Sequence, residues 1–336
     1  MKKLISLTLL LSIPALFFSC NRDTEMEGPL LVDLFADFEF TEELSISRDI
    51  VDFSTGQNII FKASFNKQAN WELTIKGLES HATKIITGFS RSMDESNALW
   101  EGSTTELPMF KTEKCLVDLF IPEDSTHITD TVEIVLPKVN EGLLIADFES
   151  GAINPSWRDP LVQSGANMSF RVAQDTSAAQ GNYYYDMGGE VNWDYLIGLL
   201  YIDAAAYGGI TFDLAENPDD VWFNFMLWVP DEIDNAIVLF QFREDENEND
   251  NYEANSEDMW AYEMTEFESG WQLISLPYSD LQNLVNGQPA DPNGNALHEP
   301  NKLRQIQLLF LADPASGYSQ AFLDYVIFTN GGPLIP

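Results

Sequence analysis

The sequence predicts an all-β protein with two consecutive β-sandwich domains, and three observations carry that prediction. The chain has 336 residues, which is more than one typical domain needs and enough for two. Beyond residue 20, short segments alternate between apolar and polar side chains and are separated by Gly, Pro, Asn and Asp. No segment of that region repeats apolar residues with a 3.6-residue period over ten or more positions, as an amphipathic helix would.

Residues 1–20 are typical of an export signal, because two lysines precede a short apolar run that Pro14 interrupts. The run is shorter than the ~20 residues that a membrane-spanning helix needs. A small residue directly before Cys20 resembles the bacterial lipobox, which implies cleavage before this cysteine and lipidation of its thiol. Residues 21–29 resemble the acidic tethers of surface lipoproteins in Gram-negative, glycan-foraging bacteria. We therefore expect a lipid-anchored protein of the outer membrane, exposed at the cell surface.

Residues 30–139 form the first predicted domain, an immunoglobulin-like (Ig-like) β-sandwich. About seven short strands in one such region are typical of that architecture. The stretch 46–65, followed by Trp71, resembles the opening of PKD-type and other Ig-like spacers of exported bacterial proteins. Cys115 lies in an apolar strand with no histidine near it in sequence, so we expect a buried thiol. The clearest predicted strands are 59–65, 71–75, 84–87, 115–121 and 131–136.

Residues 140–336 form the second predicted domain, which follows a break marked by Pro, Asn and Gly at 137–142. Its strands predict a jelly-roll β-sandwich. Segments 144–151, 270–281 and 321–329 resemble, in order, the first strand, the late strand with its turn and the closing strand of galactose-binding-like jelly rolls, which include carbohydrate-binding module families 11 and 30. The predicted strands are 209–214, 221–229, 236–243, 259–264, 271–276, 305–311 and 321–329.

The same resemblance implies a structural calcium ion that joins the first strand of this domain to the last. Glu149 and Asp324 are the positions that match, and Asp147 is a further candidate ligand. Calcium takes six to eight oxygen ligands, so these carboxylates would act together with backbone carbonyls. A purely structural use of the three side chains, in turns and backbone hydrogen bonds, is the alternative. The acidic run 244–258 lacks the glycine of an EF-hand loop and predicts a solvated hairpin loop.

Aromatic residues next to amide and charged side chains suggest a sugar-binding surface. A sugar ring packs its C–H face on an aromatic ring, while its hydroxyls need polar partners. In 221–229 and 236–243, strand alternation places polar and aromatic side chains on one mixed face of each strand, and we expect these mixed faces to form the ligand surface. Packing of the rings in the core is the alternative. The candidate ligand residues are Trp193, Tyr195, Asn224, Trp228, Gln241, Arg243 and Trp260.

Charge and motifs narrow the functional classes. The formal net charge of −37 repels phosphate backbones, which argues against nucleic-acid binding and favours neutral ligands. The three histidines are scattered, and no nucleophile-elbow, zinc-protease or phosphate-loop motif occurs, so we predict no catalytic residues.

The sequence therefore predicts a non-catalytic protein that binds a neutral polysaccharide or oligosaccharide at the bacterial surface. It would capture glycan for uptake and degradation machinery, with an outer-membrane glycan transporter as a partner and with the lipid anchor as its only membrane contact. Two alternatives stay open. A glycoside hydrolase or lyase needs only two suitably spaced carboxylates. A structural or adhesion lipoprotein would instead bind a protein partner.

Overall fold

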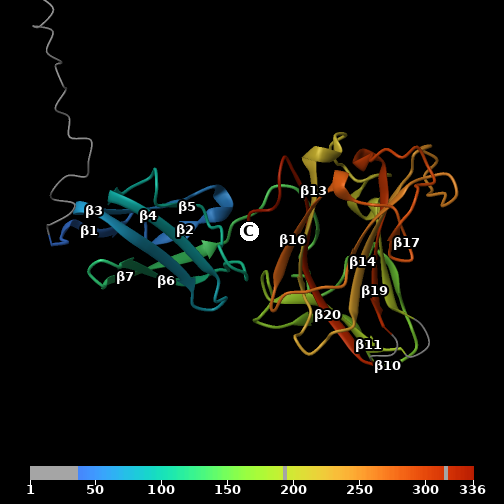
Figure 1. Ribbon diagram of the computed structural model, residues 1–336, viewed down its shortest axis with the longest axis horizontal. Coiled ribbons are helices and arrows are strands. Elements are labelled where there is room, and N and C mark those ends of the chain that lie inside the picture. Colours follow the sequence, from blue (N-terminus) through green and yellow to red (C-terminus); the bar gives the residue numbers. More distant parts are fainter. Residues whose placement is uncertain (1–36, 192–194, 314–316) are drawn as a thin grey trace, which may run out of the picture.

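The structure is a computed structural model that describes residues 37–191, 195–313 and 317–336 (Figure 1). Its described residues form β-strands joined by loops and single turns of 3-10 helix, which confirms the all-β prediction. The predicted signal, the lipidated Cys20, the acidic tether and Trp193 lie outside the described residues. No helix among the described residues has the length and apolar character needed to span a bilayer.

The N-terminal unit is a seven-stranded sheet that wraps around one core. Its strand order is β1-β3-β6-β7-β2, and β4 and β5 also pair with the long strand β3. Alternate residues of β3 and β6 are buried, and Cys115 lies among them, where burial raises the pKa of its thiol. The prediction of a buried thiol is confirmed. The strands are β1 (Phe40–Ile46), β2 (Ile50–Asp52), β3 (Ile59–Gly77), β4 (Thr83–Met93), β5 (Leu99–Trp100), β6 (Glu113–Ile121) and β7 (Thr126–Leu136).

The C-terminal unit is a sandwich of two antiparallel sheets. We call β15-β14-β19-β12-β9 the front sheet and β10-β11-β20-β13-β16, with β8 beside β20, the back sheet. The front strands are β9 (Arg158–Val162), β12 (Leu196–Asp203), β14 (Ala236–Glu244), β15 (Met259–Met264) and β19 (Leu303–Ala312). The back strands are β8 (Leu143–Ala146), β10 (Ala166–Gln174), β11 (Tyr183–Glu190), β13 (Val221–Trp228), β16 (Gln272–Pro277) and β20 (Ser319–Asn330). A hairpin of β17 (Leu284–Val285) and β18 (Gln288–Pro289) follows β16.

Phenylalanines from both sheets fill the space between them. Phe223 of β13 lies 5.0 Å, centroid to centroid, from both Phe240 and Phe242 of β14. Side chains alternate along a strand, so the residues between these phenylalanines point away from the core. The outward residues of β14 are Ile237, Leu239, Gln241 and Arg243. The core thus fixes which side chains the front sheet presents to solvent.

The N-terminal unit and the last residues of the chain cover part of the back sheet. Met109 of the N-terminal unit and Leu334 pack with Met226, Tyr325 and Ile327 in one apolar cluster. Backbone hydrogen bonds join Met109 N to Ala179 O and Thr104 N to Pro336 O, each at 2.7 Å. The C-terminus accordingly lies at the junction of the two units (Figure 1).

Candidate functional site

The outer face of the front sheet carries ordered rows of side chains, because its strands pair in register. One row runs across β14, β19 and β12 as Arg243, Gln305 and Asp203. The next row contains Gln241, Gln307 and Tyr201. A third row is apolar and consists of Leu239, Leu309, Leu199 and Leu161. The face therefore changes from charged to amide to apolar along the strands.

A hydrogen-bonded chain of side chains organises the polar rows. Gln307 Nε2 donates to Gln305 Oε1 at 3.0 Å, and Arg243 Nη1 donates to the same oxygen at 3.2 Å. Gln305 Nε2 in turn donates to Asp203 Oδ1, and Arg158 Nε donates to Asp203 Oδ2 at 2.9 Å. Gln305 and Gln307 are 7% and 3% exposed, so this chain forms the floor of the face. Side chains held in this way keep a fixed orientation toward a ligand, which lowers the entropy cost of binding.

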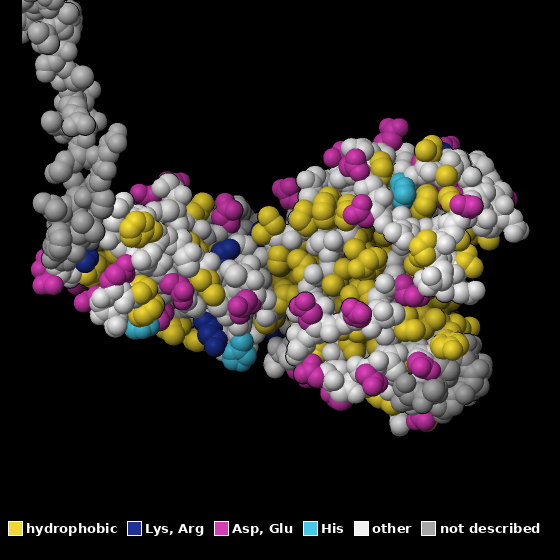
Figure 2. All heavy atoms as spheres, in the orientation of Figure 1, with side chains coloured by type: hydrophobic (Ala, Val, Ile, Leu, Met, Phe, Trp, Pro, Cys, Tyr) yellow, Lys and Arg dark blue, Asp and Glu magenta, His cyan; other side chains and the backbone are white. Residues whose placement is uncertain are grey.

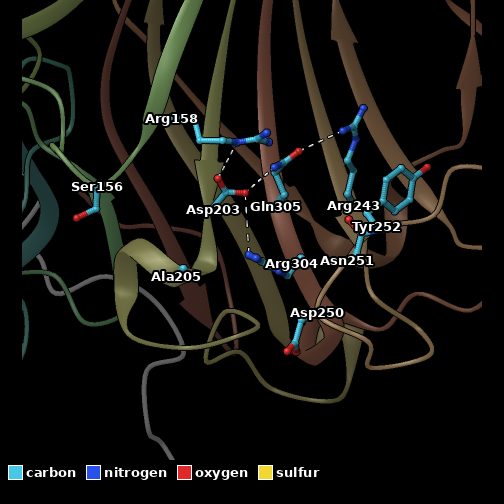
Figure 3. A pocket seen from close by; sticks show the side chains of 10 residues that line it. All are labelled: Ser156, Arg158, Asp203, Ala205, Arg243, Asp250, Asn251, Tyr252, Arg304 and Gln305. Carbon is cyan, nitrogen blue, oxygen red and sulfur yellow. Dashed lines mark hydrogen bonds and ion pairs between the residues drawn. The ribbon is translucent and has the colours of Figure 1, made fainter.

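A cavity of about 370 Å³ lies at the charged end of the face, and we call it the arginine pocket (Figure 3). Arg158, Arg243 and Arg304 reach it from three strands, and Tyr252 closes one side from the loop after β14. The Arg243 guanidinium carbon lies 4.9 Å from the centroid of the Tyr252 ring. Burial lowers the pKa of Arg243, because a charge removed from water is less favourable. The pocket combines an aromatic ring with several hydrogen-bond donors.

A larger cavity of about 590 Å³ lies on the same side of the sheet, and we call it the leucine hollow. Leu239, Leu311 and Gln241 line it from β14 and β19, and the β17–β18 turn borders it. Tyr195 stands at its edge with 57% of its surface exposed. Gln241 and Arg243 are outward neighbours on β14, so the two cavities meet on one strand. Together they offer an extended surface with apolar, aromatic and amide groups.

Three of the predicted ligand residues come together on this face. Gln241 lines the leucine hollow, Arg243 lines the arginine pocket and Tyr195 borders the hollow. Sequence alternation grouped Gln241 with Arg243 correctly, because both belong to one strand.

The other described candidates lie elsewhere, so the mixed faces of 221–229 and 236–243 do not form one surface. Asn224 is fully buried on the outer side of the back sheet, where its Oδ1 accepts a hydrogen bond from Leu334 N at 2.9 Å. Trp228 is also on the back sheet, partly buried against Trp271 and Phe322. Trp260 is 5% exposed and stacks on His298 at 3.8 Å, so it faces the core. Alternation fixes the faces of one strand, but it does not tell which sheet the strand joins.

The predicted calcium ligands gather around the loop that precedes β11. Glu149 Oε1 accepts hydrogen bonds from Asn182 N and Tyr183 N, both at 2.8 Å, and Asp324 Oδ2 accepts one from Gln180 N, also at 2.8 Å. Burial, and to a lesser degree the charge of Glu149, raises the pKa of Asp324. Gln180 Oε1 is buried and has no hydrogen-bond partner among the described residues. Carboxylate and amide oxygens are the type of ligand that calcium prefers. Asp147 instead accepts a hydrogen bond from Glu149 N at 3.2 Å.

The acidic run 244–258 connects β14 to β15 as the predicted hairpin loop, and most of residues 247–256 are exposed, but its two ends are buried and not solvated. Glu244, Asp245 and Asp258 are fully buried. Glu246 and Asp258 accept hydrogen bonds from the backbone N–H groups of residues 294–296, and one oxygen each from Glu244, Glu246 and Asp258 lie within 4.8 Å of one another. These carboxylates therefore hold the 294–296 loop in place. At the buried ends of the run, backbone N–H groups rather than water donate hydrogen bonds to the acidic side chains.

Two carboxyl groups with strongly raised pKa values lie outside the face just described. Burial raises the pKa of Glu244 to about 8, and the residue points into the core toward Tyr278. Asp324 belongs to the back sheet. General acids usually have such raised pKa values, but here neither group lines the arginine pocket or the leucine hollow. Neither of these two carboxyl groups is therefore placed to act on a ligand in either cavity.

Several residues of the face were missed by sequence reasoning. Asp203, Arg304 and Gln305 are separated from Gln241 by dozens of residues and meet it only through strand pairing. Tyr252 lies inside the acidic run, where charge dominates the pattern. Arg158 begins β9, a strand that the sequence pattern did not indicate. Only the three-dimensional register brings these residues together.

No protein-family model and no curated protein matches the chain. Among solved structures it is similar to a family 11 carbohydrate-binding module from Clostridium thermocellum in complex with a β-1,3-1,4-mixed-linked tetrasaccharide, with 15% identity, a TM-score of 0.38, and coverage of 58% of this chain and 98% of that one. It is also similar to SGBP-B from a complex xyloglucan utilization locus in Bacteroides uniformis, with 14% identity, a TM-score of 0.34, and coverage of 85% and 72%. A carbohydrate-binding module specific for non-crystalline cellulose, CBM28, shows 16% identity, a TM-score of 0.34, and coverage of 57% and 96%. At these TM-scores the function has to be inferred from the site itself.

Proposed function

We propose that this protein binds a poly- or oligosaccharide, without catalysis, along the outer face of the front sheet. The observation that carries this proposal is the chain of fixed amide and charged groups from Gln307 to Arg158. Tyr201 and Tyr252 lie against its arginines, and Tyr195 lines the neighbouring leucine hollow. Sugar hydroxyls need donors and acceptors at fixed positions, and the apolar face of a sugar ring packs on tyrosine.

The dimensions of the face suit a chain of several sugar units rather than a single one. The arginine pocket and the leucine hollow both open on the outer side of β14. Both volumes fall in the range of about 300–1,000 Å³ that is usual for small-molecule sites. An oligosaccharide lying across β14 and β19 would occupy both cavities at once. Such shallow contacts usually give micromolar to millimolar affinity.

The cellular role in this proposal comes from the N-terminal sequence. Residues 1–20 have the pattern of a lipoprotein signal, so Cys20 would carry the lipid and residues 21–29 would form an acidic tether. The Ig-like unit would hold the sugar-binding sandwich away from the outer membrane. A glycan transporter in the same membrane would take up the captured saccharide.

Calcium is also part of the proposal, as a structural ion. Glu149 and Asp324 would hold it together with the unpartnered Gln180 Oε1, and it would fix the loop before β11 to the back sheet. Calcium should raise Tm by several degrees over an EDTA-treated sample, because a ligand of the folded state adds to its stability. Glu149→Gln should remove this increase, whereas Glu232→Gln, at an exposed loop position, should keep it. An equal increase in both variants would contradict the calcium site.

The sugar-binding proposal is tested by isothermal titration against β-glucans, xylans, mannans, pectins and sulfated galactans. We expect at least one to bind, and we expect Gln241→Ala to weaken binding without lowering Tm. The control variant is Ser269→Ala, because Ser269 lies in the loop between β15 and β16, beside Trp228 and Phe322 of the back sheet. It should bind as the wild type does. Absence of binding across the panel would contradict the proposal, and so would release of reducing sugar from any polymer.

A further inference from the structure

The arginine pocket has a local charge opposite to that of the whole protein. The chain contains 17 basic against 54 acidic residues. Figure 2 shows acidic side chains scattered over the visible face of both units, with few basic ones among them. Within the pocket, however, three guanidinium groups face two carboxylates, those of Asp203 and Asp250. Three arginines from three different strands meet in one cavity, so the fold itself concentrates positive charge there.

The partners of these arginines leave positive charge uncompensated. Asp203 is the shared carboxylate: its Oδ2 lies 2.9 Å from Arg158 Nε, and its Oδ1 lies 4.0 Å from Arg304 Nη1. Arg243 has neutral neighbours instead, since its Nη1 donates to Gln305 Oε1 and its guanidinium lies over the Tyr252 ring. A guanidinium keeps its charge at physiological pH even when partly buried, so this charge needs a partner.

Hydrogen-bonding capacity is also left unused in the pocket. Arg243 Nε, Arg304 Nε and Arg304 Nη1 are buried nitrogens that have no hydrogen-bond partner within the part of the chain that the structure describes. Buried donors are paired in most proteins, because an unpaired donor costs free energy. Figure 3 shows the side chains of Arg158, Arg243 and Arg304 arranged around the Asp203–Gln305 pair, with Tyr252 beside Arg243. A planar anion entering here would meet several guanidinium groups and one aromatic ring.

We infer that the arginine pocket binds the anionic group of an acidic saccharide, either the carboxylate of a uronic acid or a sulfate ester. This inference rests on the sugar-binding function proposed above and names its ligand class. Guanidinium groups bind carboxylate and sulfate oxygens through short, charge-assisted hydrogen bonds, often two at a time. The cavity of about 370 Å³ can hold one charged sugar unit, while the neighbouring leucine hollow takes the less polar continuation of the chain. The local charge thus overrides the preference for neutral ligands that the net charge predicts.

The experiment uses matched pairs of glycans that differ only in charge. Pectin, glucuronoxylan and alginate are each compared with their carboxyl-reduced forms, and sulfated galactan is compared with its desulfated form, by isothermal titration of the full chain. We expect at least one acidic glycan to bind about tenfold or more tighter than its neutral partner. The preference should weaken as NaCl concentration rises, since salt screens charge. The pair that shows it identifies the anion as carboxylate or sulfate.

Arginine variants test whether the preference for the acidic glycan arises in the arginine pocket. The double variant Arg243→Gln/Arg304→Gln should lose the preference for the acidic partner, and Arg243→Lys, which keeps the charge, should retain part of it. The matched control is Arg171→Gln, because Arg171 lies on the back sheet and its side chain is 74% exposed. Equal binding of acidic and neutral partners would overturn the inference while leaving the sugar-binding function intact. A preference that survives in the folded double variant would also overturn it. Failure of every glycan to bind would overturn both.

Discussion

The two outer faces of the C-terminal sandwich use similar residues in different ways. On the back sheet, Trp228, Trp271, Tyr184 and Phe322 pack on one another, and Asn224 holds the C-terminal segment. On the front sheet, tyrosines lie beside amide and guanidinium groups that converge on two cavities. Aromatic content therefore does not mark a sugar site. In the function proposed above, the arrangement of polar groups around the rings distinguishes the front face from the back face.

The largest effect is expected from Asn224→Ala, which tests whether the back face is structural. The Asn224 amide donates to Thr329 Oγ1 at 2.9 Å and to two backbone carbonyls, and it accepts a hydrogen bond from Leu334 N. Its loss leaves buried groups unpaired, so the free energy of unfolding should fall by about 2–3 kcal/mol. Chemical denaturation measures this. A stable variant with weakened saccharide binding would instead make Asn224 a ligand residue.

Two substitutions that each remove an aromatic ring compare the front face with the back face directly. Tyr195→Ala should weaken saccharide binding about tenfold, which corresponds to about 1.4 kcal/mol, because it removes an exposed ring at the edge of the leucine hollow. Trp228→Ala should leave affinity within about twofold, since the Trp228 ring packs on other rings of the back sheet. Titration of both variants with the same oligosaccharide decides between the faces, and the reverse ranking would place the ligand on the back sheet.

A smaller effect concerns Glu244, at the end of the front strand β14. Burial raises its pKa from 4.5 to about 8, so the folded state holds a proton that the unfolded state has lost between these values. The contribution of Glu244 to the free energy of unfolding should therefore be fully present below pH 4.5 and should decline as pH rises toward 8. Glu244→Gln should remove at least about 1 kcal/mol of that decline, measured by denaturation at pH 5 and pH 8. An unchanged pH slope would show that Glu244 is ionised in the folded protein.

The all-β fold could be predicted from the sequence because strand alternation and turn residues are local signals. The strands that contain Phe223 and Phe240 were found in this way. The segment 209–214 was expected to be a strand but forms turns and coil, and β9, β10, β11 and β12 were not predicted. In β12, the residues from Ile197 to Leu200 are all buried, so they lack the alternation of apolar and polar side chains by which a strand is recognised.

The candidate site could be predicted only in part, for a related reason. Gln241 and Arg243 share one strand, so their common face follows from their spacing alone. Asp203 and Gln305 join them through pairing between strands far apart in sequence. Asn224 and Trp228 lie on the other sheet, because equal alternation does not distinguish the front sheet from the back sheet.

The most direct test of the central claim is a map of amide chemical shifts in the C-terminal sandwich during titration with a saccharide that binds. We predict that the perturbed amides belong to β12, β14, β19 and the loop that carries Tyr252, while those around Trp228 and Trp271 stay unchanged. Shifts confined to β13, β16 and β20 would place the ligand on the opposite sheet and would contradict the account.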